Sequence, residues 1–208
     1  MATIVPIRGV RYAPEKVGDV AEVVTPPYDI IDSAAQARYY ARHSHNIIRL
    51  ELGQMFQQDD ERNNRYTRAA GYYSRWLEEG VLAREDQPAL YLYEQEFSLE
   101  NERRVRTGFI CGVKLAPYSP GNVLPHEETL SKPKADRLQL MRVCKANFSP
   151  VFGLYDDPQE EVNQALQSAR GSRQPDVDFV DEAGECHRLW VITDSLVQEK
   201  IINSLQPK

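Results

Sequence analysis

The sequence predicts an α+β protein in which a mixed, mainly antiparallel sheet packs against several helices. Segments with the helical spacing of apolar residues alternate with segments rich in β-forming residues, and glycine and proline separate them. The chain contains no internal repeat and no low-complexity tract. Its 208 residues, of which 41% are hydrophobic and 27% charged, have the composition of a globular protein. We therefore expect a single α+β domain over residues 1–208.

The N-terminal part of the chain is predicted to begin irregularly and then to form one helix and one strand. Four prolines disfavour regular structure within residues 1–29. A helix is predicted over 33–42 because Ser33 and Gln36 have the spacing of a capping box. The β-prone run at 47–50 predicts a short strand.

The clearest helix covers residues 66–77, where apolar side chains recur at three- and four-residue spacing. Asp59 and Asp60 favour its N-terminal end through the helix dipole, and Gly80 is suited to end it. Arginines alternate with its tyrosines and tryptophan, a pattern also found on nucleic-acid surfaces. The aromatic residues occupy the positions that a core requires, so we favour a helix packed against the protein interior.

The remaining elements alternate between strands and helices. A β-hairpin is predicted from the β-forming runs 89–97 and 104–115, joined by a polar turn. Asp157-Pro158 and Asp194 each have the features of a helix start. The other predicted elements are a helix over 133–145, a buried strand over 151–155 and a strand pair formed by 177–180 and 186–192.

Composition also limits where the protein works and what it contacts. No run reaches the roughly 18 to 20 apolar residues that span a bilayer. The net charge of −6 disfavours nonspecific attraction to nucleic acid or to an anionic membrane. The three cysteines are widely separated and form no Cys-x-x-Cys pair, so they are expected to be reduced core residues. We expect a cytoplasmic protein with no membrane or nucleic-acid partner.

The first candidate site is the segment that contains Tyr28 and Asp29. Two consecutive prolines precede these residues and fix the backbone. The Tyr28 hydroxyl and the Asp29 carboxylate would then be presented to a polar ligand at little ordering cost. The alternative is a rigid turn in which Asp29 hydrogen-bonds nearby amides.

The second candidate site combines a polar loop with the start of the helix that follows it. Histidine titrates near neutrality, glutamate acts as a base or binds a cation, and basic residues beside a helix N-terminus attract phosphate or carboxylate. The alternative is a solvated loop whose charges pair with one another. The candidate ligand-binding residues of this site are His126, Glu127, Thr129, Asp136 and Arg137.

Other chemistry-bearing residues are less informative. His43 and His45 are interpreted as a solvated helix end, because no cysteine or carboxylate cluster nearby completes a zinc set. His187 falls on a predicted strand and is interpreted as a hydrogen-bonded sheet residue. The sequence has no phosphate-binding glycine loop, no Gly-x-Ser-x-Gly motif and no His-Glu-x-x-His motif. No metal site and no catalytic residue are therefore predicted.

Several short motifs, and their order along the chain, resemble those of the prokaryotic proteins catalogued as domain of unknown function 1015. The resemblance extends over nearly the whole chain. Its His-Glu-x-Thr and Asp-Arg motifs are moderately specific in combination. The motifs are Pro6 with Arg8, Pro27-Tyr28-Asp29, His126-Glu127-x-Thr129, Asp136-Arg137 and Ala146-Asn147-x-x-Pro150-Val151.

The resemblance implies a longer architecture than these 208 residues. Members of the family continue beyond the equivalent of Trp190-Val191-Ile192 into a second half with an Asp-Gly-His-His-Arg motif. That motif is similar to one in ParB-like and sulfiredoxin-like proteins, including a free-serine kinase, which implies nucleotide or phosphate chemistry. The chain has no such motif, so we expect the N-terminal part of the family architecture, either as a fragment with an incomplete site or as a short variant that keeps the N-terminal module for binding.

Two functional hypotheses follow. In the first, Asp29, His126 and Arg137 converge on a polar cleft that binds a phosphorylated small molecule or a nucleotide. In the second, the chain is a noncatalytic interaction or assembly module, with a homo-oligomer as one form of assembly. The sequence assigns neither a reaction nor a cofactor.

Overall fold

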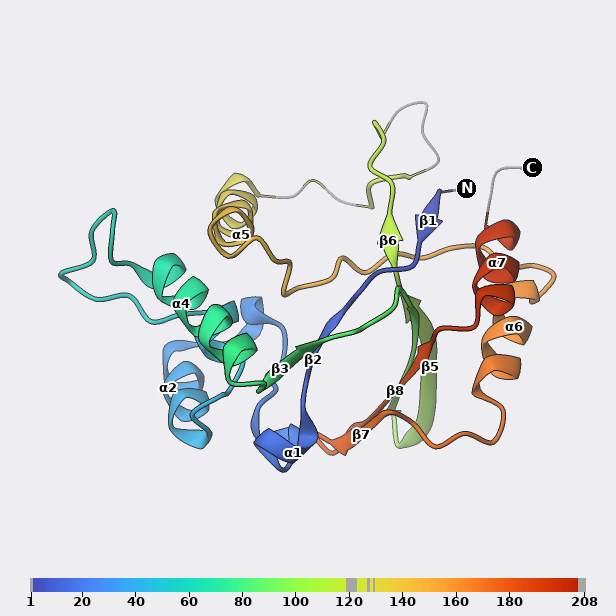
Figure 1. Ribbon diagram of the computed structural model, residues 1–208, viewed down its shortest axis with the longest axis horizontal. Coiled ribbons are helices and arrows are strands. Elements are labelled where there is room, and N and C mark those ends of the chain that lie inside the picture. The colour runs from blue at the N-terminus through green and yellow to red at the C-terminus, as the bar shows by residue number, and fades with distance from the viewer. Residues whose placement is uncertain (1, 119–122, 127, 129, 206–208) are drawn as a thin grey trace. The chain divides into compact units, whose positions relative to one another are not determined.

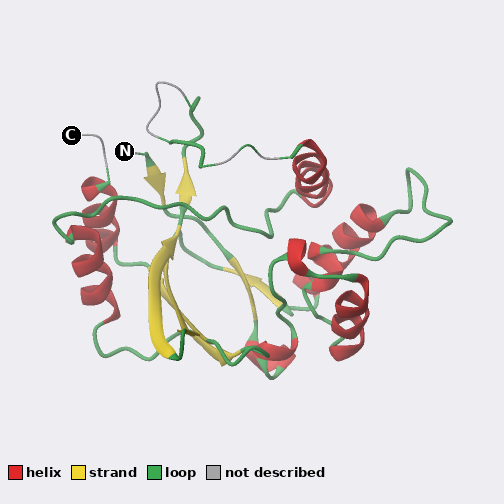
Figure 2. Ribbon diagram, turned by 180° about the vertical axis from the view of Figure 1, so that it is seen from behind, coloured by secondary structure: helices red, strands yellow, loops and turns green. Residues whose placement is uncertain are grey.

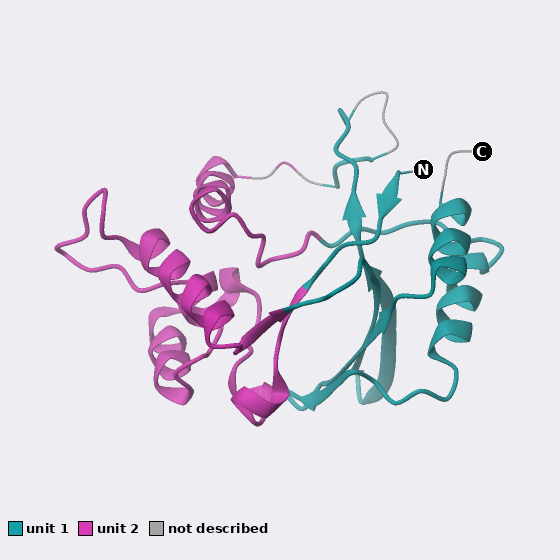
Figure 3. Cartoon of the chain, in the orientation of Figure 1, with its two compact units in different colours: residues 1–9, 84–127, 152–208 teal, residues 10–83, 128–151 magenta. Residues whose placement is uncertain are grey.

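A computed structural model describes residues 2–118, 123–126, 128 and 130–205. The chain divides into two compact units, which Figure 3 shows in different colours. Unit 1 comprises Met1–Gly9, Arg84–Glu127 and Phe152–Lys208, and unit 2 comprises Val10–Ala83 and Glu128–Val151. Each unit is described by itself below, and the single domain expected from the sequence stays a prediction.

Unit 1 is built on a four-stranded sheet with the strand order β5-β4-β8-β7 (Figure 1). All three strand pairs in this sheet are antiparallel, as the sequence predicts. A separate short pair joins β1 (Ile4–Val5) to β6 (Gly112–Val113), also antiparallel. The strands of the larger sheet are β4 (Leu90–Leu99), β5 (Glu102–Ile110), β7 (Val177–Val180) and β8 (Cys186–Ile192).

The core of unit 1 lies between one face of this sheet and two helices, α6 (Glu161–Arg170) and α7 (Ser195–Ser204). Figures 1 and 2 show these helices side by side next to the sheet. Alternate residues of β4 and β8 point toward the helices, because successive side chains of a strand face opposite sides. The buried residues include Leu90, Leu92, Trp190 and Ile192 from the strands and Val162, Leu166 and Ile201 from the helices.

Aspartates start both helices of unit 1, although not in the same way. Asp194 caps α7 by accepting hydrogen bonds from the amides of Leu196 and Val197, which confirms the predicted start. The Asp157 carboxylate accepts from the amides of Val162 and Asn163. Helix α6 begins at Glu161 and not at the predicted proline, after Glu160 in a left-handed conformation.

Unit 2 consists mainly of helices together with a short strand pair, β2 (Val10–Tyr12) and β3 (Leu82–Arg84), which Figure 1 labels. Its largest core cluster gathers Val17, Val23, Leu50, Trp76, Val81 and Leu82. The helices are α1 (Pro14–Val17), the 3₁₀ helices η1 (Val20–Glu22) and η2 (Tyr28–Ile30), α2 (Ser33–Arg42), α3 (Ile48–Glu51), α4 (Arg65–Glu78) and α5 (Ser131–Cys144).

The predicted central helix of unit 2 is confirmed as α4. Its N-terminus carries a capping box in which the Asn64 side chain accepts from the Thr67 amide and the Thr67 hydroxyl accepts from the Asn64 amide. Trp76, on the predicted apolar stripe, is 2% exposed. After the helix, Gly80 has a φ of +70°, a left-handed conformation that favours glycine.

Two predicted strands are wrong. The run 47–50 belongs to helix α3, because the buried Asn46 side chain accepts from the Ile48 amide and so starts a helical turn. The run 151–155 forms no strand, and its apolar side chains are exposed, Val151 at 93% and Leu154 at 91%. A short apolar run therefore proved insufficient to predict a buried strand.

The capping box predicted at Ser33 is also wrong, although helix α2 has the predicted bounds. Asp32 is the cap, and its carboxylate accepts from the Ala35 amide at 2.7 Å. The Gln36 side chain instead donates to the Leu52 carbonyl at 2.8 Å. Gln36 thus connects α2 to the segment after α3.

No helix in the described part of the chain combines the length and the apolar character that crossing a bilayer requires.

Candidate functional site

Helix α5 presents the predicted Asp-Arg pair on the same face as its buried residues. Leu140 and Cys144 follow Asp136 at four-residue intervals, which places all three on one side of the helix. Leu140 and Cys144 pack against Ala69 of α4 in a small core cluster. This packing fixes the position of α5 beside α4 and holds Asp136 and Arg137 at the N-terminal end of the contact.

Arg137 makes contacts on both the edge and the face of its guanidinium group. Its Nε and Nη2 donate to the Asp136 Oδ2 at 2.9 and 2.5 Å, and its Nη1 lies 3.4 Å from Glu51 Oε1. The guanidinium carbon lies 3.9 Å from the centroid of the Tyr28 ring, a cation–π contact. Two segments that the sequence analysis singled out separately, around Tyr28 and around Arg137, therefore meet within unit 2.

Asp136 binds a second arginine through its other carboxylate oxygen. Its Oδ1 accepts from Arg65 Nη2 and, at 2.7 Å, from the Tyr66 hydroxyl. Arg65 Nη2 also donates to that hydroxyl at 3.0 Å. Asp136 is therefore shared between two guanidinium groups. We call the following residues the arginine cluster: Tyr28, Glu51, Arg65, Tyr66, Asp136 and Arg137.

Glu51 is the unusual member of the arginine cluster. It is 8% exposed, and its Oε2 has no hydrogen-bond partner among the described residues. Burial raises the pKa of Glu51 above its ordinary value, and the Arg137 charge offsets only part of this rise. The carboxyl group consequently holds its proton more readily than an exposed glutamate does.

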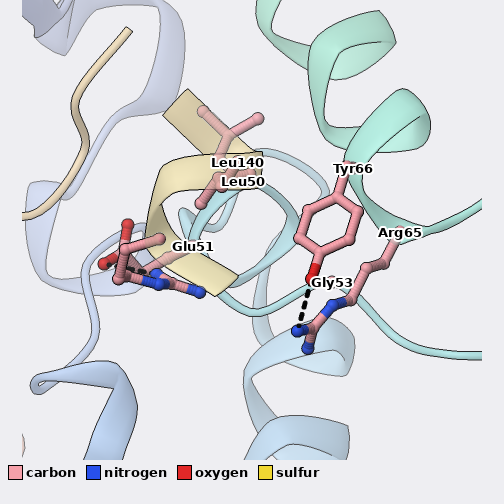
Figure 4. Close-up of a pocket in the computed structure, with 7 residues that line it drawn as sticks. Leu50, Glu51, Gly53, Arg65, Tyr66 and Leu140 are labelled. Atoms are coloured by element: carbon pink, nitrogen blue, oxygen red, sulfur yellow. Dashed lines mark hydrogen bonds and ion pairs between the residues drawn. The ribbon is translucent and has the colours of Figure 1, made fainter. Parts of the chain in front are cut away.

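The cluster surrounds a shallow depression whose side chains are packed so closely that it holds no space for a water molecule. In Figure 4, Glu51 follows Leu50 on α3, whereas Arg65 and Tyr66 come from the start of α4 and are joined by a hydrogen bond. Gly53 leaves room here, since an added Cβ would lie 3.2 Å from the Arg65 side chain. The depression is lined by Leu50, Glu51, Gly53, Arg65, Tyr66, Arg137 and Leu140.

The structure brings together three of the predicted site residues, namely Tyr28, Asp136 and Arg137. Asp29 follows Tyr28 in η2, and its side chain is exposed. His126 is exposed and belongs to unit 1, so its convergence with Asp29 and Arg137 stays a prediction. The predicted Glu127 and Thr129 lie outside the described residues.

Sequence reasoning missed Glu51, Arg65 and Tyr66. Arg65 is one of the arginines that alternate with the aromatic residues of α4, and Glu51 follows a run predicted to be a strand. One signal was available, because Arg65 and Tyr66 directly follow the Asn64 cap and so stand at the N-terminus of α4. Their partner Asp136 is about 70 residues away in the chain, and no local pattern connects them.

The structure places the side chains of His43 and His45 half-buried at the edge of the unit 2 core, and not in a fully solvated helix end. The His43 ring accepts from the His45 amide at 3.0 Å, and the His45 ring packs edge-on against Trp76. Burial, together with nearby His43, lowers the pKa of His45. Among the described residues, one group of three histidine, cysteine or carboxylate side chains has its ligand atoms close enough to share a cation, namely Asp181, Glu185 and His187.

Comparison with known proteins gives a family but no characterised relative. A family model described as "Protein of unknown function (DUF1015)" matches residues 4–208. Searches of the curated proteins and of the solved structures each found no significant match. The match covers essentially the whole chain, including the residues of the arginine cluster. The chain therefore belongs to the DUF1015 family.

Proposed function

We propose that the arginine cluster binds the phosphate group of a phosphorylated small molecule or a nucleotide. The observation that carries this proposal is that Arg65 and Arg137 share the Asp136 carboxylate while the Tyr28 ring supports the Arg137 guanidinium. Guanidinium groups bind phosphate through paired, charge-assisted hydrogen bonds. A pair of them held around one anion is thus an arrangement that a phosphate group would match.

The charge balance of the cluster supports an anionic ligand. Two guanidinium groups face two carboxyl groups, and burial raises the pKa of one of these, Glu51. When Glu51 carries a proton, the cluster has an excess positive charge, and the Glu51 hydroxyl becomes a donor. The Oε2 that has no partner among the described residues would then hydrogen-bond to a ligand oxygen.

The close packing of the cluster requires the ligand to replace an internal anion. Asp136 occupies the position between the two arginines, so a phosphate group enters when it displaces this carboxylate from Arg65 or Arg137. The two arginine side chains are each 19% exposed, which leaves one edge of the cluster accessible. Asp136 in this proposal is a competitor that keeps the arginines ordered in the absence of ligand.

The other predicted residues would contact the rest of the ligand. Asp29, exposed on the turn that carries Tyr28, would accept hydrogen bonds from ligand hydroxyl groups. The predicted residues His126, Glu127 and Thr129 stay candidates for binding such a ligand.

Calorimetric titration of the full chain with pyrophosphate and with ATP tests this proposal. We expect saturable binding that Arg137→Lys weakens by at least about tenfold, because lysine cannot reproduce the planar, paired contacts. Arg142→Lys is the matched control, since Arg142 is an exposed residue of the same helix. Asp136→Asn should strengthen binding because it weakens the internal competitor.

Two outcomes would overturn the proposal. One is an absence of saturable binding of either probe to the folded wild-type chain. The other is binding that Arg137→Lys and Arg142→Lys change equally, which would place the anion outside the arginine cluster. Circular dichroism of each variant establishes that the fold is retained.

A second candidate function is a noncatalytic interaction or assembly module. The specific observation that favours it is the exposed apolar run after α5, in which Phe152 is 66% and Leu154 91% exposed, together with Leu115 at 95%. Exposed apolar side chains supply the area that protein contacts bury when they lie together. Light scattering after size exclusion would show a homo-oligomer, and Leu154→Asp should then dissociate it.

We further propose a reducing, cytoplasmic location. The three cysteines, Cys111, Cys144 and Cys186, are all free thiols. Burial raises the pKa of Cys111 and of Cys144 to about 11, so both thiols are protonated and unreactive at neutral pH. Cys144 is a core residue and Cys111 packs against the core of unit 1, whereas Cys186 is half-buried and lies outside the core clusters of the described residues.

A further inference from the structure

The turn between β7 and β8 holds one aspartate in a fixed orientation. Asp181 Oδ1 accepts hydrogen bonds from the amides of Ala183 and Glu185, each at 2.9 Å. The Asp181 amide in turn donates to the Glu185 carbonyl at 3.0 Å, and Gly184 takes a φ of +80° that closes the turn. These contacts use only one carboxylate oxygen of Asp181 and leave Oδ2 directed toward β8.

His187 of β8 is held so that one ring nitrogen faces Asp181. Its Nε2 lies 3.2 Å from Asp181 Oδ2, and its Nδ1 lies 2.6 Å from the Tyr93 hydroxyl. The ring also stacks on Phe179, with a distance of 4.8 Å between centroids and an angle of 16° between planes. Stacking and the Tyr93 contact together fix both the plane and the direction of the imidazole.

Glu185 lies beside Asp181 and His187, and its carboxylate accepts a hydrogen bond from Gln95. Its Oε2 accepts from the Gln95 side chain at 2.5 Å, across from the neighbouring strand β4. One donor atom from each of Asp181, Glu185 and His187 lies within 4.8 Å of the other two. We call these three residues the turn cluster.

We propose that the turn cluster binds a divalent first-row transition metal ion, with Mn²⁺ as the representative. One imidazole nitrogen and two carboxylate oxygens are a donor set suited to such ions, and the two carboxylates neutralise the charge of the cation. The exposed fractions of the His187 and Asp181 side chains, 13% and 27%, give a cation access from solvent.

The surroundings of the turn cluster match those of metal sites. Metal-binding histidines and carboxylates are oriented by hydrogen bonds from residues that do not touch the metal. Here Tyr93 contacts His187, Gln95 contacts Glu185, and backbone amides contact Asp181. With the proton on Nδ1 donated to the Tyr93 hydroxyl, Nε2 presents its lone pair to the cation.

A purely structural explanation accounts for less of this geometry. The Asp181–His187 pair and the turn hydrogen bonds would suffice to close the hairpin. They do not require Glu185 to be held in place by Gln95. Glu185 therefore distinguishes the two explanations.

Titration of the full chain with Mn²⁺, followed by electron paramagnetic resonance of the free ion, tests the proposal. Mn²⁺ is chosen because the free thiols of the chain prefer softer ions. We expect one saturable site per chain, weakened at least about tenfold by Glu185→Gln, which removes a ligand charge. Glu182→Gln changes the charge of the same turn outside the turn cluster and should leave the affinity within about twofold.

Two further variants separate a metal site from a structural pair. His187→Gln should abolish binding, and Tyr93→Phe should weaken it about tenfold through the lost contact to Nδ1. The proposal is overturned if the wild type binds no Mn²⁺ saturably, or if folded Glu185→Gln binds as tightly as Glu182→Gln. If His187→Gln fails to fold, the Glu185 and Tyr93 variants decide. Phosphate plays no part in this readout, so failure here is distinct from failure of the proposed anion site.

Discussion

The arginine cluster of unit 2 and the turn cluster of unit 1 use similar residues but have opposite charge balances. In the arginine cluster, both carboxyl groups lie beside a guanidinium group, and Asp136 lies between two. In the turn cluster, two carboxylates and one imidazole lie together, and the contacts that hold them come from neutral side chains and backbone amides.

This difference in charge balance determines which kind of ligand each cluster would accept. A carboxylate that is already paired offers nothing to a cation, whereas the guanidinium groups around it can exchange it for another anion. Carboxylates oriented by neutral donors keep their charge available for a cation. The same residue types therefore predict opposite ligands, depending on which charge is left in excess.

The largest expected effect on stability comes from replacing Arg137. Arg137→Leu leaves Glu51 without its neighbouring cation and Asp136 with only one arginine, so unfolding should become easier by about 3 kcal/mol. Urea unfolding at neutral pH measures this loss. Arg142→Leu, at an exposed position of α5, should change stability by no more than about 0.5 kcal/mol. Equal effects of the two variants would show that the arginine cluster is only a surface network.

The next effect is stabilisation by a cation at the turn cluster. Free Mn²⁺ at about 100 times its dissociation constant should raise the free energy of unfolding of the wild type by about 2.7 kcal/mol. The same concentration should stabilise Glu185→Gln much less, because its affinity is lower. Chemical unfolding with and without Mn²⁺ measures both values, and an equal gain in the two proteins contradicts the assignment of Glu185.

A smaller effect separates the ring of Tyr28 from its hydroxyl. Tyr28→Leu removes the face on which Arg137 stacks and should cost about 1 kcal/mol of stability. Tyr28→Phe keeps an aromatic face and should lose less than half of that. Unfolding of both variants under one set of conditions provides the comparison, and equal losses would rule out the cation–π contact as the cause.

The smallest expected effect is the contribution of Glu51 to the pH dependence of the free energy of unfolding. The folded chain raises the pKa of Glu51 above its ordinary value of 4.5 because the carboxyl group is buried. The protonated Glu51 side chain therefore increases the free energy of unfolding below pH 4.5, and this contribution is lost as the pH rises through the pKa of Glu51 in the folded chain. Glu51→Gln, which resembles the protonated acid, should gain stability relative to the wild type as the pH rises above 4.5. Unfolding of both proteins from acidic to neutral pH measures the trend, and an opposite trend would contradict the raised pKa.

Local signals in the sequence predicted much of the fold. The apolar stripe of α4, the β4–β5 hairpin and the Asp194 cap of α7 are each encoded within one short segment. The wrong predictions arose where distant residues decide the structure. At 47–50, the buried Asn46 donates to the Glu22 carbonyl and starts a helix from a β-prone run.

The same limit applies to the candidate site. Tyr28, Asp136 and Arg137 were identified because each stands in a conformationally restricted or charged segment. Glu51 escaped notice because its significance depends on burial and on Arg137, which is 86 residues away. Asp181 and Glu185 escaped because only the closed turn brings their carboxylates toward His187.

The central claim is that Arg65 and Arg137 bind a phosphate group, and the side-chain Nε–H signals of the arginines test it most directly. We predict that pyrophosphate shifts the Arg65 and Arg137 signals along one saturable curve in nuclear magnetic resonance spectra of the full chain, and leaves the Arg142 signal in place. Unchanged Arg65 and Arg137 signals at saturating pyrophosphate would contradict the account.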